Sequence, residues 1–296
     1  MLLVTRTAGG LGNQLFQYCA AKHYSEMLGV KSALILKRWH VTRYPNIDDV
    51  LVIDLPRATN LQRIRVGDVP EHWARWKRLP CRVLIEIGKR VMPVVKVHDS
   101  EDLANPVPAD IPRDARRVLV DGTFQMSQSY EPYVDAVCRE ILQRAPERPS
   151  GLGDNRVAVS FRRGDYVPLG WTLTWSYYRE SLDKLSISKD HAIWVLSDDA
   201  GFAELAAHRL RAEGFAVEQV PSIGSSPALN DFWAMAYAEK LVSSNSSFAW
   251  WAAAVGDTLR GPSAHDVVVP RPWLAFFEPS LLRRAHWSCV DVIWND

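Results

Sequence analysis

The chain has 296 residues, of which 47% are hydrophobic and 23% charged. This length fits one large α/β domain or two of ordinary size, and the composition is that of a soluble globular protein that folds throughout. There are 35 Lys and Arg against 34 Asp and Glu, so the strong basic excess typical of nucleic-acid-binding proteins is absent.

The first predicted elements form a βαβ unit. They are a buried strand at 2–7, a glycine turn at 9–12, a helix at 14–28 and a second strand at 32–37. Asn13 is placed to cap the start of the helix and Gly29 to end it. A strand, a crossover helix and a second strand predict a parallel sheet. Between 45 and 112, short apolar runs broken by prolines allow no assignment.

The pattern of strands and helices returns after this region. A strand pattern begins near Arg117 and a helix pattern covers 130–145, followed by a stretch at 145–155 that is rich in Pro, Gly and charge and resembles a linker. We therefore place a domain boundary there and predict an N-terminal domain at 1–150 and a C-terminal domain at 151–296. Alternating strands and helices predict two doubly wound, Rossmann-like α/β domains facing a cleft.

The second half contains the more regular alternation. Strands are predicted at 156–161, 191–197, 216–220, 241–244 and near Val268, and helices at 175–185, 200–214, 228–240 and 247–255. Polar side chains follow several of these strands, at the edge where open parallel sheets bind ligands.

The glycine turn "GGLGNQ" raises the question of dinucleotide binding. Gly10 and Gly12 match two positions of the G-x-G-x-x-G fingerprint, but Leu15 occupies the third. Lys37 and Arg38 stand where the ribose-binding acid of an NAD site is expected, which disfavours NAD and leaves only a weak case for NADP. A Walker motif is absent as well. What remains is either a helix start that favours an anion or a purely structural turn.

Two arginines follow the strand at 156–161. Arg162 and Arg163 stand at its carboxyl end, with Asp165 behind them. Because arginine grips phosphate oxygens in pairs and keeps its charge, the pattern suits stabilisation of a departing diphosphate without a metal. A surface Arg–Asp pair is the alternative. Asp165 is a candidate either to orient a guanidinium or to act as a base.

Two further clusters repeat this placement. Asp198 follows the next strand and could accept hydrogen bonds from a ligand, while helix capping is favoured for at least one aspartate of the pair 198–199. Asn245, Ser246 and Ser247 stand at the start of an apolar helix and form a second candidate anion site. Phe248 and the tryptophans after it favour the core over a sugar platform.

These motifs, in this order, resemble the α-1,2-fucosyltransferase family, glycosyltransferase family 11. The resemblance rests on "GGLGNQLFQYCAAK", "SFRRGDYV", "LSDD" and "SSNSSFAWWAAAV", supported by "DGTFQMSQSY", "ALNDFWAMAYAEK" and "VVVPRPW". It implies a GT-B fold and metal-independent, inverting transfer of L-fucose from GDP-β-L-fucose to the 2-hydroxyl of a galactose-terminated glycan. No cofactor is implied beyond this donor.

The resemblance also implies roles for particular residues. Arg162 would hold the β-phosphate, with residues 245–247 lining the diphosphate site and Asp198 nearby. The four residues Gly10, Gly12, Asn13 and Gln14 would close the cleft from the acceptor side. Ser160, Arg163 and Phe248 stand in the same motifs and are counted with the substrate-binding residues.

Two departures from the family pattern matter. Ser160 replaces the histidine before the two arginines, and Thr123 replaces an aromatic residue in the middle motif. The first puts any contact of that imidazole with the donor in doubt, and the second puts the acceptor in doubt. The alternatives are a fucosyltransferase of another linkage, a non-catalytic nucleotide or glycan receptor with this fold, and an NADP-dependent oxidoreductase, which Leu15 disfavours.

The remaining features concern location. The four cysteines form no CxxC pair, which argues against zinc and fits reduced thiols in the cytoplasm. No apolar run approaches the roughly 20 residues that cross a bilayer, and the apolar run at the start is shorter than that of a signal peptide. The basic stretch 70–96, with Trp73 and Trp76, suits an anionic membrane surface, although a solvated helix face is favoured. We expect a cytoplasmic protein, with peripheral attachment to the inner face of the cell membrane as the alternative.

Overall fold

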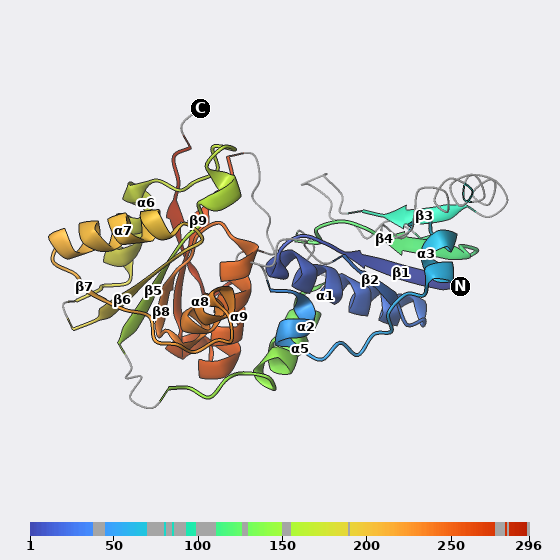
Figure 1. Ribbon diagram of the computed structural model, residues 1–296, viewed down its shortest axis with the longest axis horizontal. Coiled ribbons are helices and arrows are strands. Elements are labelled where there is room, and N and C mark those ends of the chain that lie inside the picture. The colour runs from blue at the N-terminus through green and yellow to red at the C-terminus, as the bar shows by residue number, and fades with distance from the viewer. Residues whose placement is uncertain are drawn as a thin grey trace. The chain divides into compact units, whose positions relative to one another are not determined.

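The structure is a computed structural model in which the chain forms two compact units (Figure 1). It describes residues 1–37, 45–69, 80, 85, 93–98, 111–125, 130–149, 155–188, 190–275, 282 and 284–294. The first unit comprises 1–42 and 46–137, and the second comprises 43–45 and 138–296. The predictions that involve Arg38, Trp73, Trp76, Cys81 and residues 126–129 of "DGTFQMSQSY" lie outside the described residues.

The first unit is built on a four-stranded parallel sheet. Its strands are β1 (Leu2–Thr7), β2 (Ala33–Leu36), β3 (Val94–Val97) and β4 (Arg117–Val120), in the order β2-β1-β4-β3. Its helices are α1 (Leu11–Leu28), α2 (Ile47–Val50), α3 (Asn60–Arg65) and the start of α5 (Glu131–Leu142). The predicted βαβ unit is thus confirmed, and β3, α2 and α3 lie in the region that the sequence left unassigned.

The start of α1 differs from the prediction. Gly10, not Asn13, is the N-cap, and it makes no side-chain hydrogen bond, so α1 begins three residues earlier than expected. Gly29 ends the helix as predicted, with a φ of 63° in the left-handed region that glycine adopts without strain. In the turn between β1 and α1, Gly9 has a φ of 82°, also in the left-handed region. Asn13 lies inside the helix, and its side chain makes another contact.

The second unit is built on a six-stranded parallel sheet. Its strands are β5 (Arg156–Phe161), β6 (Ala192–Ser197), β7 (Ala216–Glu218), β8 (Lys240–Val242), β9 (Asp266–Arg271) and β10 (Ser288–Asp291), in the order β10-β9-β8-β5-β6-β7. Its helices are α6 (Trp175–Lys184), α7 (Ala200–Ala212), α8 (Pro227–Tyr237) and α9 (Ser247–Arg260), with 3-10 turns at Gly164–Tyr166 and Pro262–Ala264. Every strand and helix predicted for this half is present, and β10 is additional.

Helices cover the sheet of the second unit and bury its apolar side chains. Val157, Val159 and Phe161 of β5 pack with α6 and α7 residues in one hydrophobic cluster. In α9, Trp250 and Trp251 are fully buried, and Trp250 Nε1 donates to the carbonyl of Leu282 at 3.1 Å. The prediction that these tryptophans belong to the core is confirmed.

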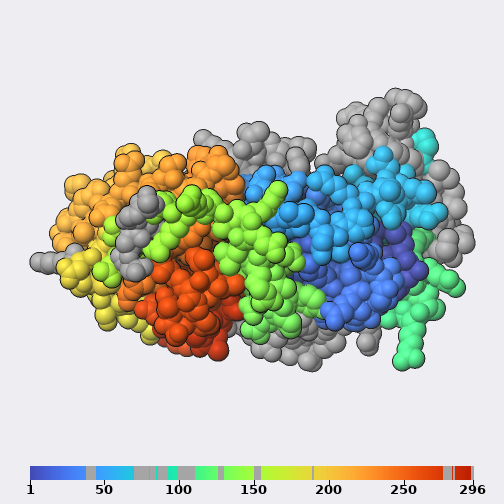
Figure 2. Space-filling model, turned by 90° about the horizontal axis from the view of Figure 1, so that it is seen from below, coloured from blue at the N-terminus to red at the C-terminus, as the bar shows by residue number. Residues whose placement is uncertain are grey.

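In the sequence, all strands of the first sheet precede the predicted boundary at 150/151 and all strands of the second sheet follow it. The two compact units instead divide within α5, between residues 137 and 138. Residues 143–149 run over the surface of the second unit (Figure 2), where Tyr237 donates its hydroxyl to the carbonyl of Pro146. The boundary therefore stays a prediction, while the α/β class with two parallel sheets is confirmed. None of the described helices is both long and apolar enough to cross a membrane.

Candidate functional site

The sheet of the second unit changes its direction of growth at β5. From β5 the chain adds β6 and β7 on one side, and it then adds β8, β9 and β10 on the other. The carboxyl ends of β5, β6 and β8 therefore meet at one edge. The crevice beyond such a switch point is where open parallel sheets bind their ligands, and the three polar clusters predicted from the sequence follow these three strands.

Arg162 follows β5 directly and lies between two carboxylates. Its Nη2 donates to Oδ1 of Asp165 at 2.6 Å, and its Nη1 lies 2.8 Å from Oδ2 of Asp198. The guanidinium carbon is 5.3 Å from the centre of the Tyr166 ring. The Arg162 side chain is 23% exposed and that of Asp165 is 64% exposed. The guanidinium is thus fixed on one side and accessible to solvent, an arrangement in which an anion can replace the exposed carboxylate.

Asp198 joins the ends of β5 and β6. Besides its contact with Arg162, its Oδ1 accepts from the backbone N–H groups of Arg163 at 2.8 Å and Gly164 at 3.2 Å. A Cβ at Gly164 would lie 2.7 Å from Oδ2 of Asp198, so only glycine allows this close approach. Asp199 instead caps α7 and accepts from the Phe202 N–H at 3.0 Å, which confirms capping by one aspartate of the pair.

The two adjacent arginines do not act together. The guanidinium carbon of Arg163 lies 4.2 Å from the centre of the Phe202 ring, a cation–π contact. Its Nε is buried and has no hydrogen-bond partner among the described residues. The Arg163 side chain therefore packs against α7, while the Arg162 guanidinium contacts Asp165 and Asp198.

The start of α9 supplies the third cluster. Ser246 is the N-cap, and its Oγ accepts from the Phe248 N–H at 3.3 Å. Asn245 is fully buried, donates from Nδ2 to the Trp171 carbonyl at 2.9 Å, and accepts at its own carbonyl from the Tyr166 hydroxyl at 3.1 Å. These bonds fasten the loop that follows Arg162 to the α9 start.

The remaining motif residues lie beside this start. Ser247 is the first helical residue of α9. The Ser160 hydroxyl lies 3.3 Å from that of Ser244 and links the ends of β5 and β8 where the family pattern has a histidine. The Phe248 ring packs edge-on against Phe232, with ring centres 5.5 Å apart. Ser160 is thus part of this strand edge, and Phe248 contacts the neighbouring helix α8.

Helix α8 brings an acid that the motif analysis did not single out. Burial raises the pKa of Asp231 from 3.8 to about 7, and the negative charge of Asp198 adds to the rise. Burial also raises the pKa of the Tyr166 hydroxyl. Asp231 stands in "ALNDFWAMAYAEK", but only the packing of α8 on the sheet relates it to Asp198, so no strand-end pattern indicates it.

The glycine-turn residues lie in the first unit. Gln14 is buried; its Nε2 donates to the Gly9 carbonyl at 2.8 Å, and its Oε1 accepts from the Ile47 N–H at 3.1 Å. Asn13 Oδ1 accepts from Gln125 Nε2 at 2.7 Å. Gly10 caps α1, and Gly12 is buried in its first turn. Both amide side chains thus hold elements of the first unit together, and their expected contact with a donor stays a prediction.

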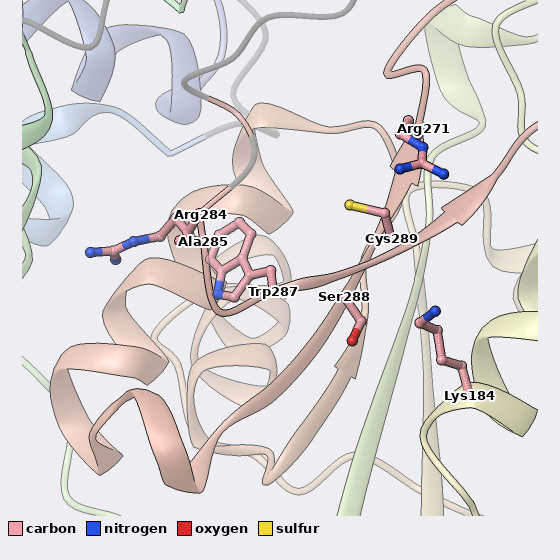
Figure 3. Close-up of a pocket in the computed structure, with 7 residues that line it drawn as sticks. All are labelled: Lys184, Arg271, Arg284, Ala285, Trp287, Ser288 and Cys289. Carbon is pink, nitrogen blue, oxygen red and sulfur yellow. The ribbon is translucent and has the colours of Figure 1, made fainter.

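A separate pocket of about 370 Å³ lies in the second unit (Figure 3). Its lining comes from the end of α6, the end of β9, β10 and the segment before β10: Lys184, Arg271, Arg284, Ala285, Trp287, Ser288 and Cys289. Arg271 is paired with Asp291 at 2.6 Å and Arg284 with Asp257 at 3.3 Å. None of the predicted site residues is among these. In the described part of the chain, no group of three or more His, Cys, Asp and Glu residues could hold a metal ion.

Comparison with known proteins relates the chain to glycosyltransferases. It is 24% identical to the α-1,2-colitosyltransferase of Escherichia coli, over 92% of both chains. Its structure is similar to that of an Arabidopsis thaliana FUT1 variant in complex with GDP, with a TM-score of 0.50, 13% identity, and coverage of 86% of this chain and 69% of the other. The heptosyltransferase WaaC of Escherichia coli with ADP matches at a TM-score of 0.45, with 16% identity and coverage of 98% and 93%.

No protein-family model matches the chain. The sequence match nevertheless confirms the resemblance stated from the motifs, because it extends over nearly the whole length of both proteins. The match to the GDP complex shows the fold, which confirms the predicted GT-B class. The chain is thus related to a glycosyltransferase.

Proposed function

We propose that the protein is an inverting glycosyltransferase that moves L-fucose from GDP-β-L-fucose to the 2-hydroxyl of a galactoside and releases GDP. The observation that carries this proposal is the position of Arg162. It lies at the switch point of the second sheet, between Asp165 and Asp198, and it follows the strand next to β8, which leads into α9. The relative that transfers colitose, and the motif order, supply the reaction class.

The negative charge that develops on the leaving diphosphate accounts for the proposed roles of Arg162 and the N-terminus of α9. As the bond between the anomeric carbon and the diphosphate breaks, negative charge grows on the β-phosphate. Arg162 would stabilise it with paired hydrogen bonds, and the N-terminus of α9 at Ser247 would add the positive end of a helix dipole. Asp198 would keep Arg162 in place through Nη1. The donor would therefore displace Asp165 from the guanidinium rather than Asp198, because Asp165 is the more exposed of the two.

The acceptor hydroxyl loses a proton as it attacks. We propose that Asp165, whose carboxylate is largely exposed, acts as the general base that accepts this proton. No metal is part of the proposal, since Arg162 and the helix start supply positive charge to the leaving group.

GDP-colitose is a second candidate donor, because the relative from Escherichia coli is a colitosyltransferase. Colitose is fucose without its 3-hydroxyl. A site that hydrogen-bonds this hydroxyl rejects the analogue that lacks it by a large factor, whereas a site that does not use it accepts both. The alternatives are therefore distinguished by the donor preference of the purified protein.

The experiment incubates the protein with GDP-fucose or GDP-colitose and a set of β-galactosides, with and without EDTA, and determines linkage by NMR. We expect an α-1,2-linked product, GDP release in equal amount, and no effect of EDTA. A product of another linkage would correct the regiochemistry. GDP binding without any transfer would instead favour a non-catalytic receptor.

A further inference from the structure

Three strand ends of the first unit carry polar side chains in one row. Thr5 of β1 and Val97 of β3 are both in register with Val120 of β4. The residues one position further along these neighbouring strands are Arg6, Asp121 and His98. A guanidinium, a carboxylate and an imidazole thus meet at the carboxyl edge of the sheet, and we call them the Arg6–Asp121–His98 row.

The row lies at the switch point of the first sheet. The chain adds β2 on one side of β1, whereas β4 lies on the other side and separates β1 from β3. Gln17 of α1 ties the turns after β1 and β4 together, since its Oε1 accepts from the Ala8 N–H at 2.7 Å and its Nε2 donates to the Gly122 carbonyl at 2.9 Å. A ligand crevice is expected at this edge by the same rule as in the second unit.

The carboxylate of Asp121 is held by a chain of charges. Arg63 Nε lies 2.7 Å from Oδ2 of Asp68, which is only 5% exposed, and Arg6 Nη2 lies 3.2 Å from Oδ1 of the same residue. Arg6 Nη1 then donates to Oδ2 of Asp121. The Asp121 side chain is 26% exposed. One carboxylate oxygen is thus fixed by Arg6, while the group as a whole remains accessible.

The tautomer of His98 is fixed by its neighbour. Its Nδ1 hydrogen-bonds to the carbonyl oxygen of Asp121, and a carbonyl oxygen can only accept, so Nδ1 carries the hydrogen. In the neutral ring, Nε2 is then an acceptor. His98 is exposed, and Nε2 has no hydrogen-bond partner in the part of the chain that the structure describes. The row thus offers two acceptors, a carboxylate oxygen and an imidazole nitrogen.

Two accessible acceptors call for a ligand that donates hydrogen bonds. The Asp121 carboxylate would repel an anion at its accessible oxygen. The cations of this cluster lie against the two aspartates: Arg6 contacts both, and Arg63 and Lys37 contact Asp68, which is 5% exposed. Neighbouring hydroxyls of a neutral sugar meet both requirements, since each donates one hydrogen bond. We propose that the Arg6–Asp121–His98 row binds hydroxyl groups of the acceptor sugar, with Asp121 and His98 in contact and Arg6 as positioning residue. This rests on the proposed function for the class of sugar.

The test measures the affinity of the full-length protein for methyl β-D-galactoside by NMR titration, with GDP affinity measured separately. His98→Asn keeps a donor near the position of Nδ1 but offers nothing at Nε2, whereas His98→Gln reaches the position of Nε2. We expect His98→Asn and Asp121→Asn to weaken galactoside binding at least about tenfold, and His98→Gln less than about threefold. GDP affinity should not change.

His208→Asn, an exposed histidine of α7, is the matched control and should leave galactoside binding unchanged. Galactoside binding that survives in both His98→Asn and Asp121→Asn would overturn the site, as would lowered melting temperatures without lowered affinity. A wild-type protein that binds GDP but not the galactoside would also overturn it. Galactoside binding without any GDP binding would instead refute the proposed function and leave the row intact.

Discussion

At the scale of single residues, opposite charges share one edge of the second sheet. Arg162 contacts Asp165 and Asp198, and Asp198 also accepts two backbone N–H groups. Asp231 on α8 lies in the field of Asp198 and is largely buried, which raises its pKa to about 7. Burial and the negative charge of Asp198 thus both favour the protonated form of Asp231.

This raised pKa predicts how stability depends on pH. A carboxyl group whose pKa is higher in the folded than in the unfolded state stabilises the fold fully only below the unfolded value. The contribution is lost as pH rises toward the folded pKa of about 7. Asp231→Asn cannot ionise, so its stability relative to wild type should rise by about 2 kcal/mol between about pH 5 and about pH 8. Urea unfolding at both pH values measures this.

The control for this prediction is Asp190→Asn, which changes an exposed aspartate of the same unit. Its stability relative to wild type should be the same at both pH values. A difference between Asp231→Asn and wild type that does not grow with pH would show that Asp231 is ionised in the folded protein throughout this range.

At the scale of elements, one buried carboxylate fastens the end of the chain to α9. Asp257, in the last turn of α9, is 3% exposed and accepts from His265 Nδ1 at 2.8 Å. It also accepts from Arg284 at 3.3 Å, His286 Nε2 at 2.8 Å and Trp287 Nε1 at 3.0 Å. A carboxylate at the C-terminal end of a helix is unfavourable by itself, so the contribution of Asp257 to stability depends on these four donors.

Asp257→Asn should therefore destabilise the protein by about 3 kcal/mol, because one amide cannot accept from all four donors and leaves Arg284 without its buried counter-charge. Chemical denaturation followed by tryptophan fluorescence measures the loss. Asp183→Asn breaks an exposed pair with Arg179 and should cost less than about 1 kcal/mol. Equal midpoints for the two variants would contradict the role of Asp257.

How far the sequence predicts an element depends on its position in the sheet. β1 and β5 were predicted to the residue, because each is an apolar run that ends at a turn or a charge. β10, "SCVD", has only one fully buried residue and forms by pairing with β9, so its own pattern does not indicate a strand. β3 lies among prolines and becomes recognisable only through its register with β4.

The residues of the candidate site also differ in how far the sequence predicts them. Arg162 and Asp198 were predicted because each directly follows a recognisable strand, and such ends converge in a parallel sheet. Ser246 was predicted because it stands at the start of an apolar helix. Asp231 was missed because its place depends on how α8 packs. His98 was missed because its strand was not assigned. Residues positioned by strand order can thus be predicted from sequence, whereas those positioned by helix packing or by register cannot.

At the scale of the whole molecule, both units repeat one arrangement. Each has a parallel sheet that changes its direction of growth, next to β1 in the first unit and next to β5 in the second. Each switch point carries an arginine held by two aspartates, Arg6 in the first unit and Arg162 in the second. In the second unit, one of these aspartates is largely exposed and can be displaced, which is why we assign the diphosphate to Arg162.

The affinity for GDP, measured by calorimetry on the wild-type protein and on Arg162→Ala, tests this assignment most directly. Arg179→Ala is the matched control, since Arg179 is also partly buried and paired with an exposed aspartate, Asp183. We predict saturable GDP binding that Arg162→Ala weakens at least about tenfold, the effect of losing charge-assisted hydrogen bonds, and that Arg179→Ala leaves unchanged. GDP binding of equal strength in wild type and Arg162→Ala would contradict the account.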